Sequence, residues 1–409
     1  MSLNVENIRK EFPILKQKVN GKPMIFLDNA ATTQKSDFVL QKYLEFYKTY
    51  NANAHRGGYY LSNKATEAYE NARKKIKQFI NAKNDYEVIF TRGTTESINL
   101  VAGVFEHDII HAGDEVIVTE MEHHSNYLPW KFACERKNAI LKILPFDDTG
   151  RLLIENLPNL ITSKTKMIAV THISNVLGIE NPIKEIIDLA HKNDVPVLVD
   201  AAQSAPHQQI DVQDLDCDFL VFSGHKMFSP NGIGVIYGKE KWLNRLSPWQ
   251  SGGEMVNTVK RDLISLNALP KKFEAGTSNV AGAVALSAAI EYIENIGWES
   301  VEEYESKINS YTFQKLSEIE GIRMYSQNPS TRVFSFNIDG IHSYDIGMML
   351  DNEGIAVRTG QLCAGLIMEH FGAKGMIRAS LAFYNTFEEI DEFCDKLIKI
   401  KNIFQSVKK

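Results

Sequence analysis

The chain has 409 residues, of which 44% are hydrophobic and 23% are charged, and its formal net charge is −6 at pH 7. This composition is that of a globular protein with enough apolar material for about two or three domains. It excludes the basic stripe of a nucleic-acid-binding protein, and no run reaches the ~20 apolar residues that a membrane span needs.

The first residues are polar and amphipathic, without the apolar core or the cleavage site of a secretion signal. The four cysteines, Cys134, Cys217, Cys363 and Cys394, lie far apart and form no C-x-x-C pair. This spacing argues against a disulfide scaffold and against a structural zinc site. We therefore expect a cytoplasmic protein that binds neither nucleic acid nor membrane.

The N-terminal two thirds of the chain alternate between helical and strand-like patterns. A short helix is predicted at 5–12, a strand at 24–27, and helices at 36–50 and 62–80. Further strands are predicted at 87–90, 115–118, 139–144, 165–170, 195–199, 218–222 and 234–237, with helices near 96–104, 127–137 and 182–192. This alternation favours an α/β fold with a mostly parallel sheet and helices on both faces.

Beyond residue 246 the pattern changes to that of a smaller α+β domain. Loops at 251–254 and 273–277 precede helices at 281–296 and up to about 319, a strand at 333–337 and a final helix at 387–404. We therefore divide the chain into an N-terminal arm, a large domain and a small C-terminal domain. The arm spans residues 1–20 and is expected to pack on the small domain, the large domain spans 21–262, and the small domain spans 263–409.

Two apolar strands end in polar residues that a buried sheet does not tolerate without a reason. The first strand ends in Asp200, and the second is followed by Ser223-Gly-His-Lys226. In open parallel sheets, ligands bind just beyond the carboxyl ends of the strands. Asp200 and Lys226 are therefore candidates to face one pocket, and the alternatives are a plain internal ion pair or two surface groups.

Gly93, Thr94 and Thr95 open a predicted helix directly after a strand. The free N–H groups at a helix N-terminus suit a phosphate, although a threonine there can also serve only as a cap. A pyridine-type cofactor needs an anion at its ring nitrogen, a lysine for a Schiff base and a phosphate cradle. Asp200, Lys226 and the two threonines supply this set.

His123 and His124 stand side by side after a predicted strand. Adjacent histidines rarely point at one metal ion, and no H-E-x-x-H spacing accompanies them. A flat imidazole that stacks on an aromatic ring is the other use of such a residue. We predict no metal site here.

The chain resembles the pyridoxal-phosphate-dependent cysteine desulfurases of the SufS type, in the class V aminotransferase group of fold type I. The resemblance covers nearly the whole chain and implies a large domain with a seven-stranded sheet and a smaller α+β domain. The motifs that carry it are Leu27–Ala31, Ala54–Gly57, Arg92–Glu96, Met121–His124, Thr171–Asn175, Val199–Gln203, Phe222–Lys226, Phe273–Thr277, Val357–Gly360 and Arg378–Ala382.

The resemblance implies roles for the residues of a cofactor site. Lys226 would form the Schiff base with pyridoxal phosphate, Asp200 would pair with the ring nitrogen, and His123 would stack on the ring. Thr277 would reach in from a neighbouring subunit, which implies a homodimer. The other expected cofactor ligands are Thr94, Thr95, Asn175, Gln203, Ser223 and His225.

The resemblance also implies the substrate and the reaction. Arg378 would bind the carboxylate of L-cysteine as a bidentate clamp, which suits the planar guanidinium, and Arg358, Asn175 and Arg56 would complete the substrate site. The thiolate of Cys363 would take the sulfur as a persulfide and leave L-alanine. Lys226, Cys363 and His123 would then be the catalytic residues, and the sulfur would serve iron–sulfur cluster assembly.

Several positions depart from the family pattern near Cys363. The family has one or two histidines directly before this cysteine, where the chain has Gln361 and Leu362, and it has a proline soon after, which the chain lacks. Ser229 replaces a usual glycine. The segment from Cys363 to Arg378 is short, which in the family goes with a sulfur-accepting partner protein of the SufE or SufU type.

Other functions stay open at this point. A selenocysteine lyase acting on L-selenocysteine, or another class V lyase or transaminase, would share the fold and the cofactor. The replacement of the histidines by Gln361 and Leu362 also fits a slow, cofactor-bound scaffold or sulfur-relay protein. A metal-dependent hydrolase built on His123 and His124 is the most distant alternative.

Overall fold

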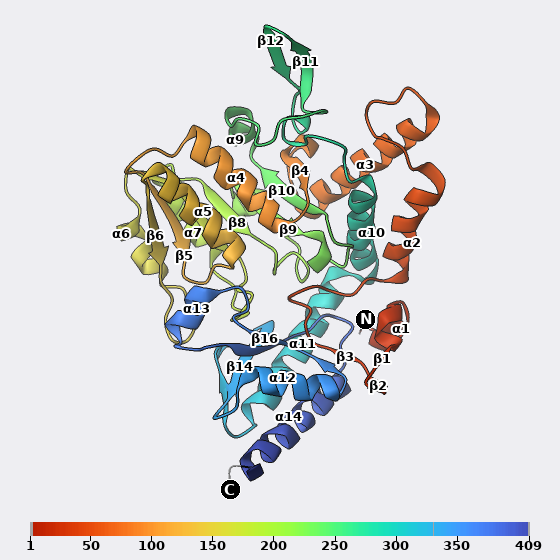
Figure 1. The fold of residues 1–409 in the computed structure, drawn as a ribbon, viewed down its shortest axis with the longest axis vertical. Helices are drawn as coiled ribbons and strands as arrows, with labels where there is room; N and C mark the ends of the chain where they lie inside the picture. Colours follow the sequence, from red (N-terminus) through yellow and green to blue (C-terminus); the bar gives the residue numbers. More distant parts are fainter. Residues whose placement is uncertain (1–2, 330, 408–409) are drawn as a thin grey trace.

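A seven-stranded sheet forms the centre of the larger part of the molecule (Figure 1), in a computed structural model that describes residues 3–329 and 331–407. From β9 to β6 all neighbouring strands are parallel, whereas β10 runs antiparallel to both β9 and β4. The predicted mostly parallel sheet is thus confirmed. In spatial order the strands are β4 (Val88–Thr91), β10 (Gly234–Gly238), β9 (Phe219–Ser223), β8 (Val197–Asp200), β7 (Thr165–Thr171), β5 (Glu115–Thr119) and β6 (Ile140–Leu144).

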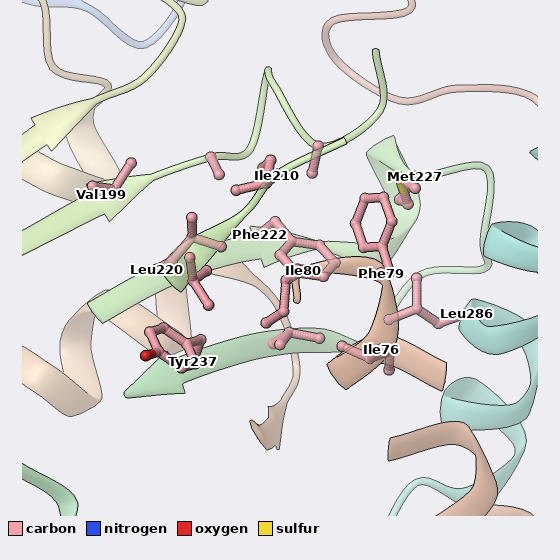
Figure 2. Close-up of a cluster of buried hydrophobic side chains, with 14 of the residues drawn as sticks. Ile76, Phe79, Ile80, Val199, Ile210, Leu220, Phe222, Met227, Tyr237 and Leu286 are labelled. Carbon is pink, nitrogen blue, oxygen red and sulfur yellow. The ribbon is translucent and has the colours of Figure 1, made fainter. Parts of the chain in front are cut away.

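Helices bury both faces of this sheet, which is why most of its strands read as continuous apolar runs. Helices α4 (Thr94–Asp108) and α5 (His124–Lys137) cover one face. Helices α3 (Tyr60–Phe79), α7 (Ile183–His191) and α10 (Val280–Ile296) cover the other. Figure 2 shows this second layer, where Phe79 of α3 lies against Phe222 of β9 with ring centroids 6.1 Å apart.

The helices follow local sequence rules. In α7 the buried residues Ile183, Ile186, Ile187 and Ala190 recur at helical spacing and form one apolar stripe. Helix α10 is rich in small residues such as Ala285, so that it packs closely along α3 and α2 (Asp37–Glu45). In each case the sequence pattern matches the face that the helix buries.

A four-stranded antiparallel sheet organises the smaller part of the chain (Figure 1). Its strands, in spatial order, are β13 (Ile322–Met324), β14 (Val333–Ile338), β17 (Met376–Ser380) and β16 (Arg358–Gly360). The helices beside it are α11 (Trp298–Ser317), α12 (Ser343–Asn352) and α14 (Phe387–Val407). The short strand β3 (Ile25–Phe26) also joins this part, because it pairs in parallel with β15 (Ile355–Ala356).

The N-terminal arm lies between the two parts. Helix α1 (Val5–Lys10) places Arg9 in an ion pair with Glu389 of α14, while Phe12 packs against Tyr292 of α10 and against Tyr384. The predicted division at residues 20 and 262 stays a prediction. The contacts place β3 with the smaller sheet and α10 with the larger one.

Three segments differ from what the sequence predicts. The helix expected at 36–50 is α-helical only as far as Glu45, and a π-helical turn, Phe46–Tyr50, follows. The helix expected from residue 96 begins at Thr94, directly after Gly93. A hairpin of β11 (Val256–Lys260) and β12 (Leu263–Leu266) projects from the larger part where no strand was expected (Figure 1). It leaves apolar side chains such as Ile264 exposed, so it lacks the polar–apolar alternation of a half-buried strand.

Shorter elements complete the chain. They are β1 (Lys18–Val19), β2 (Lys22–Pro23), α6 (Leu157–Leu160), α8 (Val212–Leu215), α9 (Glu240–Arg245), α13 (Gly365–His370) and the 3-10 turns Pro13–Lys16, Asp85–Glu87, Ile154–Asn156, Gly224–Lys226 and Lys271–Phe273. Within the described part of the chain, no helix is both long and apolar enough to cross a membrane.

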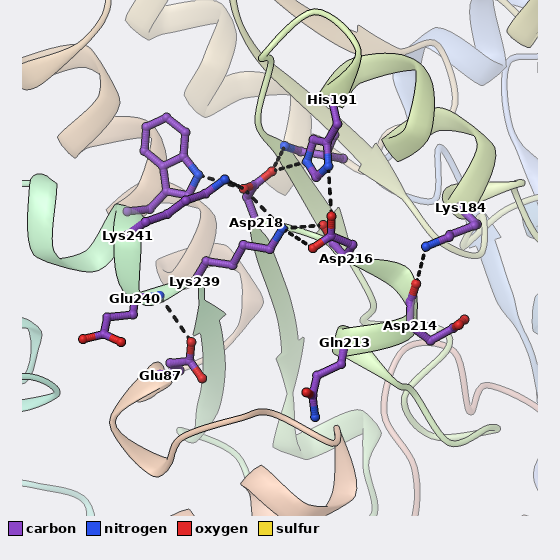
Figure 3. A network of polar contacts seen from close by, with 12 residues as sticks. Glu87, Lys184, His191, Gln213, Asp214, Asp216, Asp218, Lys239, Glu240 and Lys241 are labelled. Atoms are coloured by element: carbon purple, nitrogen blue, oxygen red, sulfur yellow. Dashed lines mark hydrogen bonds and ion pairs between the residues drawn. The ribbon is translucent and has the colours of Figure 1, made fainter.

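The buried Asp218 fixes the start of strands β8 and β9 (Figure 3). Its carboxylate accepts hydrogen bonds from the Val197 N–H at 3.0 Å and from the His191 ring at 2.8 Å. Burial alone would raise the pKa of Asp218, but the His191 bond and the charges of Lys239 and Lys241 outweigh it and lower the pKa to about 2. The network therefore fixes the positions of β8 and β9 at their starts, and the candidate site lies at the opposite, carboxyl ends of these strands.

Candidate active site

A cavity of about 180 Å³ opens at the carboxyl ends of β7, β8 and β9, between the larger sheet and the strands β16 and β17. This is the position that open parallel sheets offer to ligands. It contains all but two of the site residues predicted from the sequence. They are Thr94, Thr95, His123, Asn175, Asp200, Gln203, Ser223, His225, Lys226, Arg358, Cys363 and Arg378.

Asp200 is buried at this cavity, and Lys226 is half-buried there. Burial raises the pKa of Asp200, against the opposing effects of the Ala202 N–H, which donates to its carboxylate at 2.9 Å, and of the Lys226 charge. Burial likewise lowers the pKa of Lys226 to about 8, against the attraction of Asp200. Among the described residues the two form no direct ion pair, so the alternatives of a plain ion pair or surface groups do not hold.

Lys226 is held in place through the carbonyl group of the residue before it. The His225 carbonyl accepts hydrogen bonds from the Thr33 N–H at 3.1 Å, from the Thr32 hydroxyl at 3.0 Å and from the Lys35 amine at 3.1 Å. No role was predicted for Thr32, Thr33 or Lys35 from the sequence. Their run of small polar side chains directly after a strand was the available signal.

The N-terminus of α4 forms an anion cradle on one side of the cavity. The Thr94 N–H and hydroxyl both contact the Ser223 hydroxyl, at 2.8 Å and 2.7 Å. Gly93 has a φ of 155°, and a Cβ at the neighbouring Gly234 would lie only 2.4 Å from the Gly93 Cα. The two glycines therefore allow the helix to start close to the sheet. Its free N–H groups and the positive end of its dipole favour a phosphate.

His123 presents a neutral imidazole ring to the cavity. It caps helix α5, and its Nδ1 accepts the Ser125 N–H at 3.0 Å, which leaves the proton on Nε2. Burial, and then the positive charges of Lys226 and other neighbours, lower the pKa of His123 to about 3. A flat, uncharged ring suits stacking against a cofactor ring.

These groups fit pyridoxal phosphate. The cofactor would place its ring nitrogen at Asp200, whose buried carboxylate gains from a positive partner, and its phosphate at the α4 cradle. Lys226 supplies the amine, and burial also keeps the nearby His225 neutral by lowering its pKa to about 4. Gln203 lies beside them and donates to the Ala30 carbonyl at 2.8 Å.

Two arginines on neighbouring strands form the opposite wall. Arg378 of β17 and Arg358 of β16 are direct partners in the antiparallel register, where like charges destabilise a sheet. Arg378 is 3% exposed, donates to Asp28 at 2.9 Å and to the Asn175 carbonyl at 3.1 Å, and its buried Nε has no partner. A carboxylate bound at this wall would offset the repulsion between the two arginines.

Cys363 is the cysteine that reaches the cavity. It is half-buried and lines the space next to Lys226 and Arg378, whereas the other three cysteines are buried elsewhere. Burial raises the pKa of the Cys134 thiol to about 11 and that of Cys394 to about 12, and it raises the pKa of Cys217 still further. The buried three are therefore poor nucleophiles.

Arg56 and Thr277 lie outside this cavity in the same chain. Arg56 pairs with Glu254 at 2.5 Å, and Thr277 lines a separate cavity of about 330 Å³ together with Tyr69 and Trp249. Their predicted roles therefore stay predictions. The first cavity is also lined by residues that were not predicted as site residues, namely Ala30, Ala31, Ser125, Thr171, Ala202 and Leu362.

The two adjacent histidine rings lie apart and are not parallel to each other. The His123 and His124 ring centroids are 6.3 Å apart, and the rings are tilted relative to each other. In residues 3–329 and 331–407, no group of three or more histidine, cysteine or acidic residues is arranged to hold an ion. The hydrolase alternative therefore has no support in this part of the chain.

Comparisons with known proteins agree with this site. The family model described as aminotransferase class-V matches residues 25–393. A protein of Cronobacter sakazakii named cysteine desulfurase is 46% identical over 404 residues, which cover 98% of this chain and 100% of the relative. The crystal structure of the Escherichia coli cysteine desulfurase CsdA aligns with a TM-score of 0.91 and 36% identity, over 98% of this chain and 100% of that one. The apo structure of a cysteine desulfurase from Thermococcus onnurineus aligns with a TM-score of 0.93 and 37% identity, over 98% and 99% of the two chains.

The lowered pKa of Lys226 predicts how pyridoxal phosphate attaches to the cofactor-free protein. Only the neutral amine is nucleophilic, so the attachment rate should rise with pH through a midpoint near 8 and then level off. The growth of the cofactor's visible absorption band after mixing measures this rate, with Lys226→Ala as the blank. A rate that still rises steeply above pH 10, as for an ordinary lysine, would contradict the assignment.

Proposed function

The chain belongs to the class V aminotransferase family and is a pyridoxal-phosphate-dependent cysteine desulfurase, and we propose that Cys363 is the residue that takes the sulfur from L-cysteine. The observation that carries this proposal is the position of Cys363 in one cavity with Lys226 and Arg378. An amine, a thiol and a carboxylate-binding arginine are what the reaction needs around one substrate.

Arg378 and Arg358 orient the substrate. Arg378 lines the cavity and is almost completely buried, and a hydrogen bond from a buried guanidinium to a carboxylate is stronger than one in water. Asp28 and the Asn175 carbonyl hold the guanidinium so that it cannot rotate away. The substrate carboxylate would therefore be fixed at this wall, with its thiol directed toward Cys363.

Lys226 and His123 handle protons around the substrate. Pyridoxal phosphate, when bound, supplies an electron sink that weakens the bonds at the amino acid Cα. Because burial keeps a large fraction of Lys226 neutral near pH 8, its amine can take and return a proton there. His123 remains neutral and offers its Nε2–H as a donor at the other side.

The sulfur step balances without an external oxidant. The Cys363 thiolate attacks the substrate sulfur, and an S–S bond forms while the bond between that sulfur and Cβ breaks. Cβ keeps the electron pair and takes a proton, so L-cysteine and the thiol become L-alanine and a Cys363 persulfide.

We further propose that the persulfide sulfur passes to an acceptor protein of the SufE or SufU type and serves iron–sulfur cluster assembly. Helix α13 begins at Gly365, directly after the Cys363 loop, so no long arm can carry the thiol to a distant acceptor. An acceptor that reaches into the cavity fits this arrangement. A SufS-type subfamily and a cytoplasmic location stay predictions.

We also propose a homodimer in which Thr277 of one subunit completes the phosphate site of the other. The position of Thr277 supports this, because within one chain Thr277 does not line the first cavity and instead lines a separate one that Arg92 and Glu96 also line. The same exchange would account for Arg56.

Loss of the Cys363 thiol should abolish desulfuration. In Cys363→Ala, formation of alanine and sulfide from L-cysteine should fall by on the order of 100-fold or more, because the sulfur has no acceptor. Cofactor absorbance should be unchanged, and Cys134→Ala, which alters a buried cysteine, should remain active. A Cys363→Ala enzyme with full activity toward L-cysteine would instead point to a transaminase or another lyase.

The dimer proposal predicts a mass in solution of twice the 46.2 kDa chain. Thr277→Ala should weaken pyridoxal phosphate binding by roughly tenfold to hundredfold, which is the loss of one hydrogen bond to a charged group. Thr277→Ser keeps the hydroxyl and is the matched control. Sedimentation and cofactor titration test both points, and a monomer, or equal affinities in the two variants, would reject the exchange.

A further inference from the structure

The loop that carries Cys363 has a strained backbone. Leu362 and Cys363 have φ values of 53° and 56°, in the left-handed region that residues with a side chain rarely adopt. Two consecutive residues of this kind persist only where surrounding contacts hold them. The contacts that hold this loop therefore decide where the thiol lies.

His124 makes two hydrogen bonds to the loop, one at the Cys363 carbonyl and one two residues further on. Its backbone N–H donates to the Cys363 carbonyl at 2.8 Å, and its Nε2 accepts the Gly365 N–H at 3.1 Å. The Asn175 side chain adds a third hydrogen bond, to the Leu362 carbonyl at 2.9 Å. These bonds fix the peptide groups next to the cysteine without using the thiol itself.

The Leu362 side chain anchors the same loop in the apolar core. It is 4% exposed and belongs to the buried apolar cluster that also contains Ala364 and Ile367. Gln361, the other residue before the cysteine, is exposed. The chain thus has a buried apolar side chain directly before Cys363.

We propose that His124 and Leu362 are positioning residues that hold the Cys363 thiol at the substrate sulfur. The inference rests on the proposed role of Cys363. An Nε2 that accepts the Gly365 N–H carries no proton and is engaged, so His124 acts through the loop backbone and not as the base of the thiol. In a chain without a histidine directly before the cysteine, a fixed orientation of the thiol lowers the barrier, because no entropy has to be lost to orient it in each turnover.

The test compares His124→Ala with His124→Gln in the holoenzyme. Glutamine can place its carbonyl oxygen where Nε2 lies and accept the same N–H, whereas alanine cannot. Hydrogen–deuterium exchange of the Gly365 amide should become about tenfold faster in His124→Ala. Its kcat with L-cysteine should fall roughly threefold to tenfold at an unchanged KM, and His124→Gln should restore both values.

His111→Ala, which removes an exposed histidine, is the control and should match the wild type in exchange and in rate. Leu362→Ala tests the anchor independently and should speed exchange of the Cys363–Gly365 amides without changing cofactor absorbance. If His124→Ala does not fold, the exchange rates of Leu362→Ala test whether these contacts hold the loop. Gly365 exchange that stays at the wild-type rate in the folded variants would overturn the proposal.

Failure of the proposed function would look different. A wild-type enzyme that forms no persulfide on Cys363 would refute the sulfur role, while the exchange measurement would still report whether His124 holds the loop. A loss of kcat in His124→Ala that glutamine does not restore, with Gly365 exchange unaltered, would count against the positioning role alone.

Discussion

The site depends on two opposite charges that the fold removes from water at the carboxyl ends of β8 and β9. Burial makes the charged form of Asp200 and that of Lys226 costly, and each charge offsets part of the other's cost. An apolar pair at these positions would avoid the free-energy cost of burying two charged groups. A buried acid and amine that line one cavity without a direct ion pair are arranged for a ligand that needs both.

The rest of the architecture sets other groups around that pair. The Asp218 network fixes the starts of β8 and β9, and residues 32–35 hold the His225 carbonyl next to Lys226. The smaller sheet then supplies Arg378 and the Cys363 loop, and the loop bonds to His124 at the start of α5. Asp200 and Lys226, the proposed cofactor ligands, thus follow strands of the larger sheet, whereas Arg378, the proposed substrate clamp, and Cys363 come from the other part of the chain.

Much of this could be predicted from the sequence for a physical reason. Strands buried on both faces appear as continuous apolar runs, so β8 and β9 were found within two residues of their bounds. Polar residues at the carboxyl ends of these strands, such as Asp200, indicate where the cavity lies. The hairpin of β11 and β12 was missed because its exposed apolar side chains carry no periodic signal. The roles predicted for Arg56 and Thr277 stay predictions, because neither residue lines the cavity of its own chain.

The contacts around Cys363 were beyond sequence reasoning. His124 and Gly365 are 241 positions apart, and nothing in either local pattern indicates that they meet. The sequence shows that Gln361 and Leu362 replace the usual histidines. Only the fold shows that Leu362 is buried and that the His124 imidazole accepts the Gly365 N–H. The replacement of the usual histidines by Gln361 and Leu362 suggested a slow enzyme. In the structure, the buried Leu362 and the hydrogen bonds from His124 hold the same loop.

The central claim is that Cys363 receives the substrate sulfur. The most direct test is mass spectrometry of the cysteine peptides after one equivalent of L-cysteine labelled with a heavy sulfur isotope has reacted under non-reducing conditions. The account predicts one heavy sulfur atom on the peptide of Cys363 and none on those of Cys134, Cys217 and Cys394. Release of L-alanine with no labelled sulfur on Cys363 would contradict it.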